Sequence, residues 1–133
     1  MHEFGIAEAL LRSVIEEADG QAYKVQRVRR VRVAVGRLLS VSPESLSQAY
    51  EGLAEGTVAE GSRLDLRIVP VTARCRRCEW EGEVEPPFFA CASCGGGGLE
   101  VKTGRELRLE ELEVDDHDDN DRSRVQGSEG RKQ

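Results

Sequence analysis

The chain has 133 residues, 33% of them charged and 38% hydrophobic, with a formal net charge of -6 at pH 7. This length suffices for one small domain with an appended module and leaves no room for a large active-site cleft. The acidic balance argues against a nucleic-acid-binding protein, which needs a basic face to neutralise phosphates. No apolar run approaches the ~20 residues that cross a bilayer, so we expect no membrane span.

The first half of the chain predicts two amphipathic helices and two strands. Apolar residues recur at three and four positions over 4–18, which marks the buried stripe of a helix. Valines alternate with arginine and alanine over 25–35, as in a strand with one buried face. Ser42 and Pro43 read as the N-cap and first residue of a second helix. A second alternating strand follows over 63–68.

Four cysteines, all that the chain contains, then form two Cys-x-x-Cys pairs separated by twelve residues: Cys75, Cys78, Cys91 and Cys94. Two residues between thiolates let one tight turn direct both sulfurs at a single ion. Two such turns supply the tetrahedral shell of structural Zn(II). Disulfides are the main alternative, but acidic residues interrupt the N-terminus where a secretory signal would lie, so we expect a cytoplasmic protein with reduced thiols. A redox dithiol and a rubredoxin-like iron site are the remaining interpretations.

The segment around the cysteines has little apolar material for a core of its own, so we expect the metal to organise it. After it, Leu107 and Leu109 alternate with charged residues, and Leu112 and Val114 continue on the opposite phase. This pattern predicts a strand with a bulge near Glu111.

The predicted architecture is α+β, with a small three-stranded sheet, two helices and an inserted zinc-ribbon-like module. The α/β body comprises 1–71 and 104–114, and the module spans 72–103. Apolar residues nearly vanish over 115–133, which we expect to be a disordered acidic tail. His117 lies there, and we interpret it as solvated, without a ligand role.

The chain start carries a second candidate metal site at His2. Its imidazole nitrogen and its own backbone amide nitrogen can close one chelate ring. Adjacent amides or a carboxylate, such as that of Glu3, can complete a planar set. Planar nitrogen and oxygen coordination favours Ni(II) or Cu(II) over tetrahedral Zn(II). A histidine near an N-terminus is otherwise commonly incidental.

Several features together resemble one known family over about residues 1 to 114. They are the opening Met1, His2 and Glu3 before a helix, the strand ending in Val35 and Gly36, the helix opening at Pro43, the paired cysteines, and the run Gly104, Arg105, Glu106 and Leu107. The cysteine spacing alone is shared with many zinc ribbons, so the specificity comes from the combination. The chain looks like a member of the HypA family, called HybF in one branch, of nickel metallochaperones for [NiFe]-hydrogenase maturation.

The resemblance implies two metal sites of opposite character. Zinc on the four cysteines is structural. Nickel at the N-terminus, held through His2 and Glu3, is transferable. The implied partners are the GTPase HypB and the hydrogenase large subunit. Some members of the family also serve urease, which adds urease accessory proteins as candidate partners.

Two departures from the family pattern limit this carry-over. Some members bring a carboxylate from the turn after the first strand toward the nickel, but here that turn has no acid before Glu44, which puts a third protein carboxylate in doubt. Some members also exchange histidines with the zinc thiolates as pH changes. This chain has no histidine beside its cysteines, so we predict no such switch; nitrogen replacing sulfur around zinc in X-ray absorption spectra would refute that.

A zinc-ribbon adaptor that binds a protein or nucleic-acid partner without a second metal is the alternative function. Arginines clustered over 27–32 and 74–77 would supply its basic patch, although we interpret them as solvated surface. An enzyme is not expected, because the cysteines are committed to metal and no nucleophile has a plausible base. Gly95–Gly98 is not a phosphate loop, since no lysine follows it.

Overall fold

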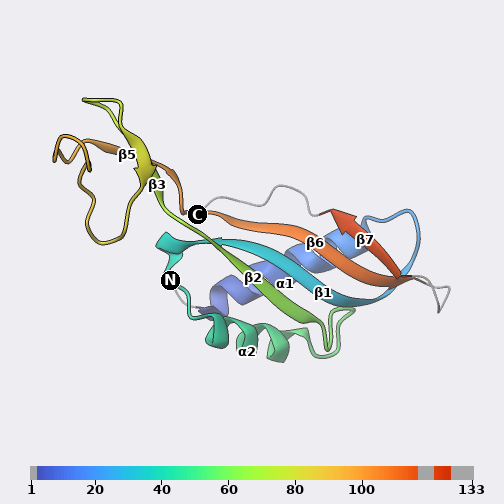
Figure 1. The fold of residues 1–133 in the computed structure, drawn as a ribbon. Coiled ribbons are helices and arrows are strands. Elements are labelled where there is room, and N and C mark those ends of the chain that lie inside the picture. The colour runs from blue at the N-terminus through green and yellow to red at the C-terminus, as the bar shows by residue number, and fades with distance from the viewer. Residues whose placement is uncertain (1–2, 117–121, 127–133) are drawn as a thin grey trace.

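The computed structural model describes residues 3–116 and 122–126. Two helices lie on one face of a four-stranded sheet, and a second, three-stranded sheet projects from one end of this body (Figure 1). The body consists of α1 (Glu3–Asp19), β1 (Val25–Gly36), the short 3-10 helix η1 (Arg37–Leu39), α2 (Pro43–Ala54), β2 (Arg63–Val69), β6 (Leu107–Asp116) and β7 (Arg122–Gln126). The predicted α+β fold is thereby confirmed, but the body sheet has four strands instead of the predicted three, because β7 adds an edge strand. Within residues 3–116 and 122–126 we find no helix that could span a lipid bilayer.

The strand β1 is the centre of the body. It pairs in parallel with β2 and antiparallel with β6, giving the sheet order β2-β1-β6-β7. Val31, Val33 and Val35 are completely buried beneath the helices, as their alternation predicts, and Val28 joins this row because of a register shift between Val28 and Arg30. The helices pack on this valine row through Ile6, Val14, Leu46 and Tyr50, which are also completely buried.

The predicted bulge in β6 is present. Arg32 lies opposite Glu111 and Val33 lies opposite Leu109, so Glu110 is the extra residue in the register with β1. This one-residue shift turns both Leu109 and Leu112 toward the core, where they are 4% and 0% exposed. The change of phase in the sequence is therefore what keeps β6 apolar on one face.

The C-terminal segment differs from the predicted disordered tail over 115–133. Asp115 and Asp116 extend β6, and Arg122–Gln126 form β7, antiparallel to β6. An unpaired edge of β6 would leave backbone N–H and C=O groups without partners, and β7 pairs with them. Val125 is the only apolar residue of the segment and stands opposite Leu112 in this register. His117 lies outside the described residues.

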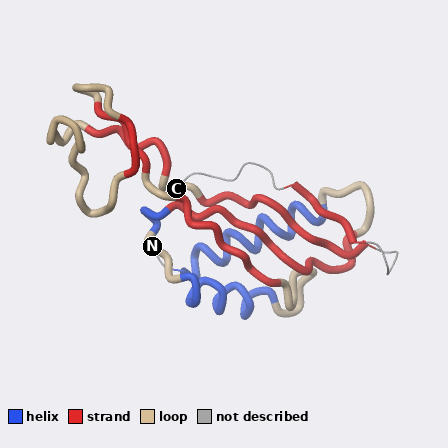
Figure 2. The backbone as a smooth tube through the Cα atoms, viewed as in Figure 1, coloured by secondary structure: helices blue, strands red, loops and turns tan. Residues whose placement is uncertain are grey.

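The inserted module contains β3 (Thr72–Cys75), β4 (Glu81–Glu83) and β5 (Leu99–Thr103), in the order β4-β3-β5 (Figure 2). It has a small core, which its composition did not suggest. Val71, Ala73 and Val84 are buried together, and Leu38 from η1 packs against them. The body thus contributes a side chain to the module.

Close backbone contacts hold this junction. Gly36 N–H donates to Glu106 O at 2.7 Å, and Leu38 N–H donates to Gly104 O at 2.8 Å. A Cβ placed on Gly36 would lie 2.2 Å from the carbonyl carbon and oxygen of Gly104, so glycine is required there. Arg37 also forms an ion pair with Glu85 of the module.

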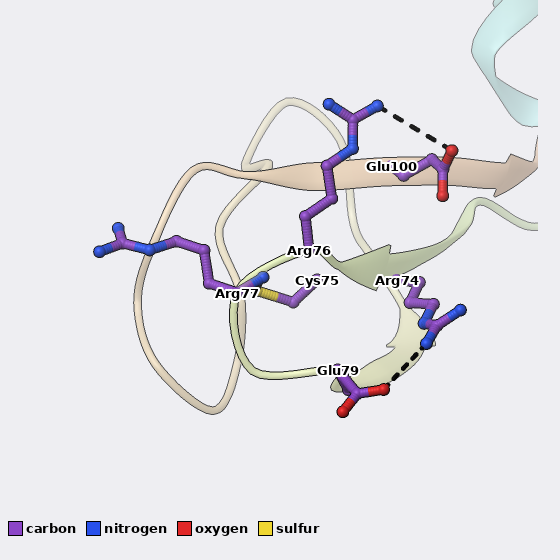
Figure 3. A pocket seen from close by; sticks show the side chains of 6 residues that line it. All are labelled: Arg74, Cys75, Arg76, Arg77, Glu79 and Glu100. Carbon is purple, nitrogen blue, oxygen red and sulfur yellow. Dashed lines mark hydrogen bonds and ion pairs between the residues drawn. The ribbon is translucent and has the colours of Figure 1, made fainter.

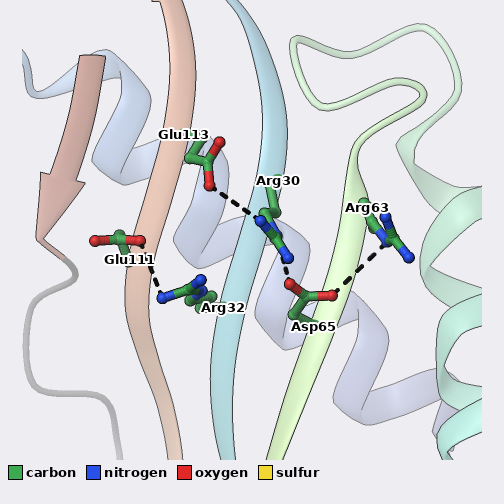
Figure 4. Close-up of polar contacts among 6 residues, drawn as sticks. All are labelled: Arg30, Arg32, Arg63, Asp65, Glu111 and Glu113. Atoms are coloured by element: carbon green, nitrogen blue, oxygen red, sulfur yellow. Dashed lines mark hydrogen bonds and ion pairs between the residues drawn. The ribbon is translucent and has the colours of Figure 1, made fainter. Parts of the chain in front are cut away.

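The sheet face opposite the helices is covered by charged side chains rather than by another layer (Figure 4). Arg30 pairs with Asp65 and, at 3.4 Å, with Glu113, while Arg32 lies 3.6 Å from Glu111. The clustered arginines of β1 are therefore offset by acids of the neighbouring strands, as a solvated strand face would be.

Candidate metal centre

Two tight turns bring the four predicted cysteines together. Their sulfur atoms all lie within 4.8 Å of one another. Cys75 Sγ is 3.8 Å from Cys94 Sγ, and Cys78 Sγ is 3.4 Å from Cys91 Sγ. Tetrahedral Zn(II) with bonds of ~2.3 Å requires sulfurs about 3.8 Å apart. The donor set therefore has the chemistry and the spacing of a four-thiolate zinc site.

The two turns have matching backbone hydrogen bonds. Glu79 N–H donates to Cys75 O at 3.1 Å, and Gly95 N–H donates to Cys91 O at 2.9 Å. The residue after the second cysteine has a left-handed backbone in both turns, with φ +65° at Glu79 and +73° at Gly95. Glycine suits that conformation and glutamate does not, so the first turn carries local strain that the second avoids.

Backbone amides also stabilise the sulfurs as thiolates. Arg77 N–H donates to Cys75 Sγ, and the N–H groups of Ser93 and Cys94 donate to Cys91 Sγ, each at 3.4 Å. Burial disfavours the charged form of Cys91, yet its backbone donors and the contacts with the Cys78 and Cys94 thiols together outweigh burial and lower the pKa of Cys91 to about 6. Donors from the backbone likewise lower the pKa of Cys75. Thiolates are the form that binds metal, so these turns favour metal binding at neutral pH.

The Cys78 thiol ionises later than these two. Trp80 N–H favours the Cys78 thiolate, but the hydrogen bond to Cys91, burial and the contacts with the other two thiols together outweigh it and raise the pKa of Cys78 to about 11. The Cys91 thiolate accepts a hydrogen bond from the S–H group of Cys78, which favours the neutral form of Cys78. A bound cation would remove this conflict by holding all four thiolates.

Three arginines lie on one side of the sulfur cluster, next to Cys75. Arg74, Arg76 and Arg77 line a cavity of about 360 Å³ beside Cys75, together with Glu79 and Glu100 (Figure 3). Arg74 pairs with Glu79 at 3.0 Å and Arg76 with Glu100 at 3.9 Å. Zn(II) with four thiolates carries a formal charge of roughly -2, which these guanidinium groups would offset.

The second predicted site is only partly described. His2 lies outside the described residues, whereas Glu3 opens α1. The Ser42 backbone N–H donates to Glu3 Oε2 at 2.9 Å, which fixes the carboxylate against the turn before α2. Sequence reasoning missed this contact, because it joins residues 39 positions apart and the donor is a backbone group.

Comparison with known proteins gives consistent matches. The sequence profile of the HypA family, described as hydrogenase/urease nickel incorporation metallochaperones, matches residues 1–114. Hydrogenase maturation factor HypA 2 of Bradyrhizobium diazoefficiens is 38% identical over 115 residues, covering 86% of this chain and 100% of that protein. HypA of Desulfitobacterium hafniense is 35% identical over 116 residues, covering 87% and 100%. The solution structure of the Ni metallochaperone HypA from Helicobacter pylori matches with a TM-score of 0.63 at 22% identity, covering 86% of this chain and 97% of that one, and supports the fold.

Proposed function

Because this chain belongs to the HypA family of nickel metallochaperones for hydrogenase maturation, we propose that its chain start, through His2 and Glu3, holds the Ni(II) that it delivers. The match of the family profile from residue 1 onward carries this proposal, since the matched range spans the positions of His2 and Glu3. Imidazole nitrogen, amide nitrogen and carboxylate oxygen form a planar donor set of the kind that Ni(II) favours.

The Glu3 carboxylate supports this assignment by its position. The hydrogen bond from Ser42 N–H holds one oxygen at the first residue of α1. A carboxylate has about four lone-pair sites, so it can bind a metal while it accepts this bond. The turn before α2 thus keeps one nickel ligand in place while the preceding residues arrange around the ion.

The four cysteines have a different role in this proposal. Cys75, Cys78, Cys91 and Cys94 hold a permanent Zn(II), because four thiolates close the coordination shell and leave no open position. The nickel site has few protein ligands and can exchange them with a partner. The zinc module therefore shapes the protein while the chain start carries the cargo.

The partners and setting follow from the same family role. The GTPase HypB and the hydrogenase large subunit are the expected partners in delivery, and urease accessory proteins are further candidates. The protein acts in the cytoplasm, and it carries nickel without catalysing a reaction.

A calorimetric titration of Ni(II) into zinc-loaded protein tests the N-terminal site. One site of micromolar or tighter affinity, about -8 kcal/mol, is expected in the wild type. It should disappear in His2→Ala and remain in His117→Ala, which removes the other histidine and leaves β7 in the chain. Absence of nickel binding, or its loss only in His117→Ala, would favour the zinc-ribbon adaptor instead.

Two substitutions at Glu3 separate metal binding from structure. Glu3→Gln keeps an acceptor for Ser42 N–H but loses the anionic ligand, so nickel affinity should fall while thermal stability stays unchanged. Glu3→Ala loses both, and should lower stability as well. Equal nickel affinity in wild type and Glu3→Gln would remove Glu3 from the ligand set.

A further inference from the structure

The strand β2 forms one outer edge of the body sheet. It pairs with β1 on one side, and no other segment within 3–116 and 122–126 pairs with its second side. Alternate residues of an edge strand direct backbone N–H and C=O groups outward, where an added strand can bind them.

The helix-facing side of β2 is incompletely covered. Leu64 and Leu66 are only half-buried, and Ile68 is 44% exposed. The corresponding leucines of β6, Leu107 and Leu109, are less than 10% exposed. The sheet therefore leaves apolar area along β2 that one more strand would cover.

A cavity of about 400 Å³ lies where this apolar row ends. It is lined by Gly36, Arg37, Ser40, Val41, Pro43 and Ile68. Val41 and Pro43 flank Ser42, whose backbone N–H holds Glu3. The edge of β2 thus leads directly to the turn that anchors the chain start.

We propose that the outer edge of β2 is the docking site for an extended segment of the protein that exchanges nickel with this chain. The segment adds a further strand to the sheet and places an apolar side chain in the cavity lined by Val41, Pro43 and Ile68. This inference rests on the proposed nickel site at the chain start, beside which the docked segment would lie.

The charges of β2 define the chemistry of that segment. On the outer face, the side chain of Arg63 is 77% exposed, and its partner Asp65, at 3.8 Å, is held more closely by Arg30. An acidic side chain opposite Arg63 would complete this pairing. The segment therefore alternates acidic and apolar residues, and a basic strand would be rejected by like charge.

A second copy of the chain is a poorer occupant. The helix α2 lies along the same edge of the body as β2 (Figures 1 and 2). Pairing of two β2 edges about a two-fold axis would bring the two α2 helices against each other on the same face of the joined sheet. A single extended segment meets no such obstacle, since α2 would then support its inner face.

Amide hydrogen exchange followed by NMR tests the site on zinc-loaded, nickel-free protein. The probe is a synthetic peptide of about ten residues that alternates Val and Glu, at millimolar concentration. Alternate amides of β2 should gain protection. The same peptide N-methylated at alternate amides should give none, because it cannot form the ladder.

Three variants make the test specific. Ile68→Glu should weaken peptide binding by about tenfold, because it places a charge beside the cavity. Phe88→Glu, at an apolar residue of the module that is 78% exposed, should leave binding unchanged. Arg63→Glu should reverse the preference, so that a peptide alternating Val and Lys binds better.

The proposal would be overturned if the peptide protected no amides, or only amides outside β2. It would also be overturned if the wild type bound the Val/Glu and Val/Lys peptides equally well, or if Phe88→Glu weakened binding as much as Ile68→Glu does. Protection of β2 that rises with protein concentration in the absence of peptide would identify a second copy as the occupant and would also overturn it. Nickel is absent throughout, so failure here leaves the nickel titration unaffected.

Discussion

The junction between the body and the zinc module offers a sharp test of the packing, through Gly36→Ala. Its backbone, at φ -67° and ψ 139°, is accessible to any residue, so alanine brings no conformational strain. Its Cβ, however, would lie 2.2 Å from Gly104 C and 2.5 Å from Arg105 N. These neighbours are backbone atoms and cannot rotate away.

The expected cost comes from two sources. Overpacking in a filled site costs about 1–3 kcal/mol. Separation of the two segments would also weaken the hydrogen bonds from Gly36 to Glu106 and from Leu38 to Gly104, each contributing about 0.5–1.5 kcal/mol. Together they predict a loss of about 2–6 kcal/mol in the free energy of unfolding, a large fraction of the stability of a small domain.

Urea denaturation of zinc-loaded protein, followed by circular dichroism, measures this loss. With a slope of about 2 kcal/mol per molar, the midpoint should fall by about 1–3 M. Gly52→Ala is the matched control. It lies inside α2 with nothing within 4 Å of the new Cβ, so it should raise stability by about 0.5–1 kcal/mol. A Gly36→Ala midpoint equal to that of the wild type would refute the close packing at this junction.

Three further predictions concern the module and the sheet surface. Removal of zinc by a chelator should abolish amide protection over 72–103 while the valine-rich core of the body keeps its protection, as hydrogen exchange would reveal; persistence of module protection would contradict it. Glu79→Gly should raise zinc affinity by about 0.5–1 kcal/mol and Gly95→Ala should lower it by a similar amount, since both residues have a left-handed backbone. Competition with a chromophoric chelator measures both affinities, and effects of the same sign would contradict the backbone strain. The hydrogen bonds of Arg67 lower the pKa of Glu110. The ion pair therefore contributes about 0.2–1 kcal/mol to the free energy of unfolding above pH ~4.5, and this contribution is lost as pH falls through the lowered pKa. NMR titration should find a higher pKa for Glu110 in Arg67→Ala, and an unchanged value would refute the pairing.

The amino-acid sequence by itself determined the helices α1 and α2, the strands β1, β2 and β6, and the thiolate cluster. Periodic apolar residues fix helix and strand type locally, because burial of one face requires a period of 3.6 or 2. The phase change between Leu109 and Leu112 even located the bulge. The spacing of Cys75 and Cys78 predicts a common metal because the turn between them is too short to separate their sulfurs.

Contacts between distant parts of the chain were decided only by the tertiary structure. The hydrogen bond between Glu3 and Ser42, the entry of Leu38 into the module core, and the pairing of β7 with β6 all join segments that no local pattern links. Backbone donors and steric gaps carry no signature in residue type, and strand order depends on which edges meet once the helices have covered one face of the sheet. Residue patterns therefore predicted the main elements of the body and the metal chemistry. Their assembly decided that, among the described residues, the outer edge of β2 is unpaired and that a cavity lies next to the turn that holds Glu3.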